Sequence, residues 1–101
     1  MRIAIKKPGQ PIEIKEVENE LRALQEIAGG YIQCVNIFDN VLCVCNEEGK
    51  LKDLPANFVL GNDVIVGNVF FCAAGDEDFE SLNDEQIEIL MNEMHIFEIK
   101  N

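Results

Sequence analysis

The chain has 101 residues, of which 48% are hydrophobic and 27% are charged, and this describes one soluble domain, residues 1–101, with a core of its own. Its 19 acidic and 8 basic residues give a formal net charge of −11, which argues against direct binding to nucleic acid or to an anionic membrane. No apolar stretch is long enough to span a membrane, and charges follow the N-terminus too early for a signal peptide, so we expect a cytoplasmic protein.

The first residues of the chain predict a β-hairpin. Residues 2–7 alternate weakly between apolar and polar types and end at Pro8-Gly9, a pair that favours a type II turn. Residues 11–17 then alternate apolar and charged positions, which is typical of a half-buried strand with one face in water. The two strands are therefore expected to pair across the turn.

A change of period marks the first helix. After Asn19, a candidate N-cap, apolar residues recur at three and four positions. Gly29-Gly30 offers the left-handed backbone position that commonly ends a helix. These signals predict a helix at about residues 20–28.

The middle of the chain predicts a second hairpin and then a loop. Residues 31–38 and 41–45 are rich in apolar and β-branched types, and Asp39-Asn40 between them tolerates tight-turn geometry. Residues 46–50 break this pattern. Residues 52–62 combine proline, glycine and Asx residues with a few apolar anchors, so we expect a loop there.

Residues 63–73 form an apolar run long enough for one or two strands, and Gly67 within it marks a bend, a bulge or a close backbone approach. Because the run is apolar at nearly every position, we expect it at the centre of the sheet. Together with the flanking hairpins it predicts an α+β fold, in which one mostly antiparallel sheet of five or six strands is packed by two helices.

The second helix has the clearest local signals. Asn83 and Gln86 have the spacing of a capping box, and Leu82 can pack against Ile87 as a hydrophobic staple. The apolar side chains that follow at helical spacing are expected to face the sheet: Ile87, Leu90, Met91 and Met94. The remaining positions are expected to face water: Glu88, Asn92 and Glu93.

The four cysteines, Cys34, Cys43, Cys45 and Cys72, contain no Cys-x-x-Cys pair. Cys43 and Cys45 share one face of a strand, and Cys34 on the neighbouring strand could approach them to make a three-thiolate metal site. Free cysteines, however, usually pack as small hydrophobes, and structural zinc takes four ligands. We therefore expect reduced cysteines and no metal.

Catalytic signals are weak. The acidic residues in the range 76–84 have a spacing similar to the alternate ligands of a calcium loop, but Ser81 and Ile87 stand where that loop has glycine and glutamate. His95 is a lone imidazole near the end of a helix, and no nucleophile is paired with it at a known spacing. We expect no cofactor and no enzyme activity.

Acidic residues are concentrated toward the C-terminus. Residues 1–50 hold eight acidic and six basic residues, whereas residues 51–101 hold eleven and two. Between Asp76 and Ile99 there are nine carboxylates and no lysine or arginine. This run is interpreted as a solvated helix face, as a surface for a basic partner protein, or as a mimic of the DNA phosphate backbone.

A second candidate surface is polar. The turn-rich segments between the apolar runs concentrate amides and carboxylates, which can recognise the polar edge of a small ligand; turn chemistry alone is the alternative. If there is a ligand site, we expect Tyr31 to stack on the ligand and four side chains to provide polar recognition: Asn46, Glu47, Asn57 and Asp63.

Five blocks occur in a familiar order over nearly the whole chain: residues 24–32, 45–51, 54–57, 63–67 and 79–82. In these blocks the chain resembles a family of small acidic proteins from Firmicutes, their phages and conjugative elements, which is known only as a domain of unknown function. The resemblance implies a mobile-element setting close to antirestriction modules, and it supplies no activity. The cysteine content departs from the family pattern.

Two classes of function follow. The first is a non-enzymatic binding protein of phage or mobile-element type, a counter-defence protein that sequesters a small molecule in a polar loop pocket. The alternative is an acidic interaction protein that mimics DNA or blocks a partner surface, and so inhibits a host nucleic-acid-binding protein. The expected partner is accordingly a small-molecule ligand or a host defence protein, and homo-oligomerisation is left open.

Overall fold

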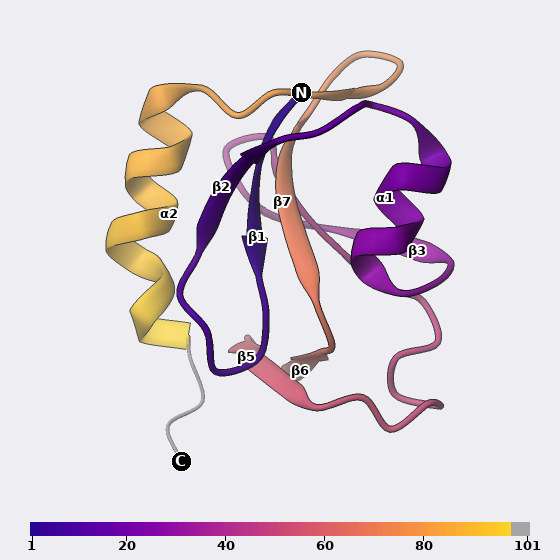
Figure 1. Ribbon diagram of the computed structural model, residues 1–101. Helices are drawn as coiled ribbons and strands as arrows, with labels where there is room; N and C mark the ends of the chain where they lie inside the picture. Colours follow the sequence, from indigo (N-terminus) through magenta and orange to yellow (C-terminus); the bar gives the residue numbers. More distant parts are fainter. Residues whose placement is uncertain (98–101) are drawn as a thin grey trace.

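The computed structural model describes the backbone of residues 1–97 and the side chains of residues 1–93 (Figure 1). It has two helices and eight strands within that range. In chain order they are β1 (Arg2–Lys6), β2 (Glu13–Glu16), α1 (Leu21–Ala28), β3 (Ile32–Phe38), β4 (Val41–Asn46), β5 (Ala56–Leu60), β6 (Asp63–Val66), β7 (Val69–Ala74), β8 (Phe79–Glu80) and α2 (Asp84–Phe97).

The main sheet is antiparallel throughout. Its strand order is β2-β1-β7-β4-β3, and the short strand β8 pairs with the end of β7 to make it six-stranded. A separate two-stranded sheet is formed by β5 and β6. The predicted α+β fold with a mostly antiparallel sheet is confirmed, with this small second sheet as an addition.

The main sheet is covered on both faces (Figure 1). Along β7, Phe70 and Cys72 face α1, whereas Val69 and Phe71 face the other side, where α2 and the β5–β6 hairpin lie. All four of these side chains have no exposed surface. Burial on both faces explains why the central strand is apolar at every position rather than at every second one.

Both predicted hairpin turns are confirmed. In the first, Gly9 has φ of +72°, and the Gln10 N–H donates to the Lys7 carbonyl at 3.0 Å, as the expected turn requires. In the second, Asp39 and Asn40 have φ of +35° and +61°, the left-handed geometry that a two-residue hairpin loop needs.

The helix starts confirm one capping prediction and correct the other. At α2, the Gln86 N–H donates to Asn83 Oδ1 at 2.8 Å and the Asn83 N–H donates to Gln86 Oε1 at 2.9 Å, which completes the predicted capping box. At α1, the N-cap is Glu20 and no side chain caps the helix. Asn19 instead donates from Nδ2 to the Phe79 carbonyl at 3.0 Å and so joins the helix start to β8.

Two strand predictions change. The loop expected at residues 52–62 is wrong in part, because residues 56–60 form β5 and pair with β6 across a turn at Gly61 with φ of +61°. The apolar run 63–73 divides into β6 and β7, which belong to different sheets, and Gly67 with φ of +77° makes the break. Only β7 lies at the centre of the main sheet, as predicted for the whole run.

The predicted strand at residues 11–17 also differs, because only Glu13–Glu16 pair with β1 and all four of these residues are exposed. This segment is one of the two edge strands of the main sheet, and the half-buried Ile12 and Val17 on either side of it pack against the two core clusters. Within the described residues, no helix is both long and apolar enough to cross a membrane.

The predicted orientation of helix α2 is confirmed except at Met91. Leu90 is buried at 2% exposure and Ile87 packs half-buried against the core, as expected, but Met91 is 51% exposed. Gln86 and Ile89 are also half-buried, and the three residues predicted to face water are exposed: Glu88, Asn92 and Glu93. Met94 is expected to face the sheet and His95 to lie near the end of the helix, but both side chains lie outside the described residues.

The difference in burial between Leu90 and Met91 gives a stability prediction. Leu90→Ala should lower the free energy of unfolding by about 2–5 kcal/mol, because it removes a buried leucine from the core. Met91→Ala, one residue away on the same helix, should change it by no more than about 0.5 kcal/mol. Urea denaturation followed by circular dichroism measures both, and an equal loss in the two variants would contradict the observed helix orientation.

Candidate functional site

Asn46, one of the predicted polar residues, is buried at 4% exposure at the end of β4. Its Nδ2 donates to the carbonyl of Ala28, in the last turn of α1, at 3.1 Å, and its Oδ1 accepts from the Glu48 N–H at 2.8 Å. Both ends of the amide are therefore used within the fold. Asn46 satisfies a helix-end carbonyl and fixes the turn that follows β4.

Asn57 is also buried, at 2% exposure, and it lies at the start of β5. Its Nδ2 donates to the carbonyls of Lys6 at 2.9 Å and Gly67 at 2.8 Å. These bonds join the β5–β6 hairpin to the end of β1 and to the linker before β7. The Oδ1 of Asn57 is buried and has no hydrogen-bond partner among the described residues.

Asp63 and Glu47 are both exposed, and they line a small polar hollow. The Asp63 carboxylate accepts from Lys50 Nζ and from the Val64 N–H, and the hydrogen bond from Lys50 lowers the pKa of this carboxyl below its ordinary value. This ion pair connects β6 to the turn after β4.

The structure brings three of the five predicted site residues together. Asn46, Glu47 and Asp63 line the polar hollow, whereas Tyr31 and Asn57 do not. Tyr31 is 65% exposed at the start of β3. The hollow has a volume of about 110 Å³, and typical ligand pockets have about 300–1,000 Å³. It has room for a few water molecules rather than for a metabolite.

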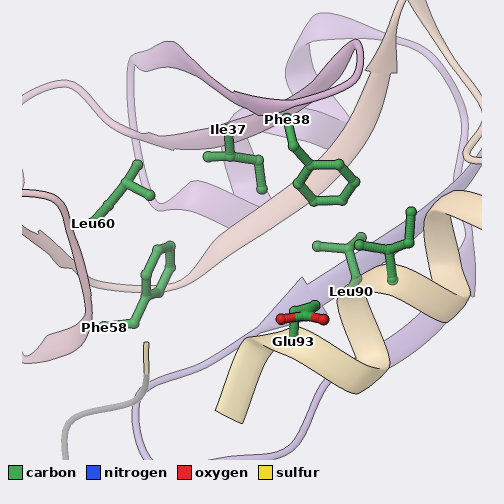
Figure 2. A pocket seen from close by; sticks show the side chains of 7 residues that line it. Ile37, Phe38, Phe58, Leu60, Leu90 and Glu93 are labelled. Carbon is green, nitrogen blue, oxygen red and sulfur yellow. The ribbon is translucent and has the colours of Figure 1, made fainter. Parts of the chain in front are cut away.

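A larger pocket lies on the sheet face that α2 covers (Figure 2). It has a volume of about 460 Å³, which is within the range of small-molecule sites. Strand β3 contributes Ile37 and Phe38, β5 contributes Phe58 and Leu60, and α2 contributes the rest of the lining: Ile89, Leu90 and Glu93.

The lining of this apolar pocket is anchored in the core. Phe58 is 1% exposed, and its ring lies 6.0 Å from that of Phe71 on the central strand at a tilt of 36°. Leu90 is held from the opposite side by α2, whose start is fixed by the capping box. Because its walls belong to strands and a helix, the pocket is formed without movement of a loop.

Sequence reasoning does not find this pocket. The apolar anchors Phe58 and Leu60 are visible in the sequence, but within an expected loop. Glu93 is exposed, as expected, and it reaches the rim of the pocket because it lies one helical turn after the half-buried Ile89. Bringing β3 and β5 to the same place requires the tertiary structure.

The cysteines do not form a cluster. Cys43 and Cys45 are buried on the α2 side of the sheet, Cys72 is buried on the α1 side, and Cys34 is exposed. Burial raises the pKa of Cys72 to about 12 and raises the pKa of Cys43 as well. Among the side chains that the structure describes, no three histidine, cysteine, aspartate or glutamate residues are arranged so that they could hold a metal ion.

The comparison with known families gives one match. Residues 1–95 match the family described as "Domain of unknown function (DUF3846)", so the chain belongs to that family, and the resemblance seen in the sequence is confirmed. No curated protein and no solved structure matches the chain. The family is a domain of unknown function and assigns no activity to the chain.

The bonds of Asn57 predict a structural role. Asn57→Ala should lower the free energy of unfolding by about 2–3 kcal/mol, because the buried carbonyls of Lys6 and Gly67 lose their shared donor. Asn62→Ala, in the exposed turn between β5 and β6, should change it by no more than about 0.5 kcal/mol. Thermal or urea unfolding tests this, and a fully stable Asn57→Ala variant would leave the amide free for another role.

The Lys50–Asp63 pair predicts a pH dependence. Because the folded-state pKa of Asp63 is lowered, the ion pair should be intact above the ordinary carboxyl pKa and should be lost as the pH falls through the lowered value. In Lys50→Met the Asp63 pKa should move back up toward 3.8. Carboxyl-carbon NMR titration measures both values, and an unchanged Asp63 pKa in the variant would show that the pair does not form.

Proposed function

We propose that this protein is a non-enzymatic binding protein whose ligand occupies the apolar pocket between β3, β5 and α2. The observation that carries the proposal is the pocket itself, which combines about 460 Å³ with six apolar side chains and a single charged one. Pockets of this size with apolar walls and few polar groups are the usual sites for small molecules.

The predicted polar site is less suited to a ligand than the apolar pocket. The amides of Asn46 and Asn57 bind backbone carbonyls, and the hollow beside Asp63 is about four times smaller than the apolar pocket. A ligand there would have to displace bonds that hold the fold together. The apolar pocket requires no such displacement.

Binding fits the pocket better than catalysis does. Among the described side chains that line it, Glu93 is the one titratable group. General acid–base and covalent mechanisms use a second positioned group next to the first. A carboxylate in an apolar pocket can nevertheless select a ligand by charge.

In the mobile-element setting that the family resemblance implies, we propose that binding serves counter-defence. A phage or conjugative element gains if a small molecule on which a host defence system depends is removed from solution. A binding protein does this without chemistry, provided that it is abundant and that its pocket excludes water from the ligand.

The pocket is tested with the neutral apolar dye Nile red, whose fluorescence rises in apolar surroundings. Leu60→Lys should weaken dye binding at least tenfold, because it places a charged chain in the pocket lining. Val59→Lys, on the neighbouring residue of β5 and outside the lining, should bind within twofold of the original protein. Equal binding by the two variants, with both folded, would contradict the pocket.

A second candidate is the acidic interaction protein. All eight carboxylates between residues 76 and 93 are exposed, and Asp84 also pairs with Arg2 at 2.9 Å. This surface can meet a basic protein or imitate a phosphate backbone. The variant to test neutralises four acids outside the pocket: Asp76→Asn, Glu77→Gln, Glu85→Gln and Glu88→Gln. Loss of counter-defence activity in cells with unchanged dye binding would favour the acidic surface.

A further inference from the structure

We infer that the apolar pocket selects ligands with a positively charged group on an apolar body, such as alkyl or aryl amines. This inference rests on the proposed function and adds the chemical class of the ligand. It is carried by the position of Glu93, the one charged side chain among the described residues that line the pocket. Figure 2 shows its carboxylate beside Leu90, at the edge of the apolar walls.

Glu93 is exposed at the rim of the pocket. It lies one helical turn after the half-buried Ile89, so its carboxylate is open to water and also next to the apolar lining. A ligand cation bound against this lining would pair with the carboxylate, and the pair gains strength where the ligand excludes water from it.

The aromatic wall favours the same ligand class. Phe38 is half-buried and lines the pocket, and a phenylalanine ring attracts a cation that approaches its face to within about 6 Å. A carboxylate together with an aromatic ring is a suitable environment for an ammonium group. The aliphatic residues Ile37, Leu60 and Ile89 then accommodate the apolar body.

An anionic ligand is disfavoured by the same surroundings. The described lining contains no lysine, arginine or histidine that could pair with a carboxylate or phosphate of the ligand. The exposed Glu85 and Glu88 on α2 add negative charge along the helix. This field attracts cations toward the pocket and repels anions from it.

The test compares three probes that share one alkyl chain: octylamine, octanol and octanoate, each titrated into the intact protein at pH 7 by isothermal calorimetry. Octylamine should bind at least fivefold more tightly than octanol, and octanoate should bind more weakly than octanol. Raising the salt concentration should reduce the preference for the amine, because exposed charges are screened.

Two variants, each of which removes one negative charge, test which residue causes the preference for octylamine over octanol. Glu93→Gln should reduce the octylamine-to-octanol affinity ratio to about one. Glu26→Gln removes the same charge from an exposed position of α1, on the opposite face of the sheet, and should leave the ratio unchanged. If the original protein binds octylamine and octanol equally well, or if its preference for octylamine persists in Glu93→Gln, the inference is overturned. Binding of octanol would still support the pocket in either case. If none of the three probes binds, the proposed function fails as well.

Discussion

The whole fold depends on burying both faces of β7. This strand pairs with β1, β4 and β8, and its aromatic side chains point to opposite layers. Phe70 packs edge-on against Phe79 with ring centroids 6.5 Å apart, and Phe71 lies against Phe58. A strand this apolar is stable only if each face is covered. One face is covered by α1, whereas the other is shared between α2 and the β5–β6 hairpin, and the pocket lies between these two covers.

Signals between neighbouring residues predict the features that depend only on such neighbours, namely helix caps and tight turns. The capping box at Asn83 and the turn at Asp39-Asn40 each involve residues close in sequence, so their chemistry can be read from the chain. The exposure of Met91 and the existence of β5 escape such reasoning, because both depend on segments far away in the chain. The periodicity of α2 identifies Ile87 and Leu90 as covered, but it does not show that the sheet leaves Met91 exposed.

The roles of the two amides in the predicted polar site also depend on residues far away in the chain. From the sequence, Asn46 and Asn57 are candidates for ligand recognition, because amides at strand ends can pair with polar edges, or for turn chemistry alone. In a small domain, the backbone carbonyls at the junctions of layers need the same donors, since a buried carbonyl without a partner is costly. The structure uses both amides in this way. The sequence pattern is the same in either case, so only the positions of Ala28, Lys6 and Gly67 distinguish the two roles.

The acidity of the C-terminal region and the apolar pocket are separate features in the sequence, and the structure joins them at α2. Glu93 belongs to the acidic run, yet it lines the pocket together with Ile89 and Leu90. A negative surface around a low-dielectric pocket concentrates cations at its entrance, and a carboxylate at the wall then distinguishes a cation from a neutral molecule of the same shape. Under the proposed function, the exposed acids of the helix need no macromolecular partner, because their role is to direct a small cation to the apolar pocket.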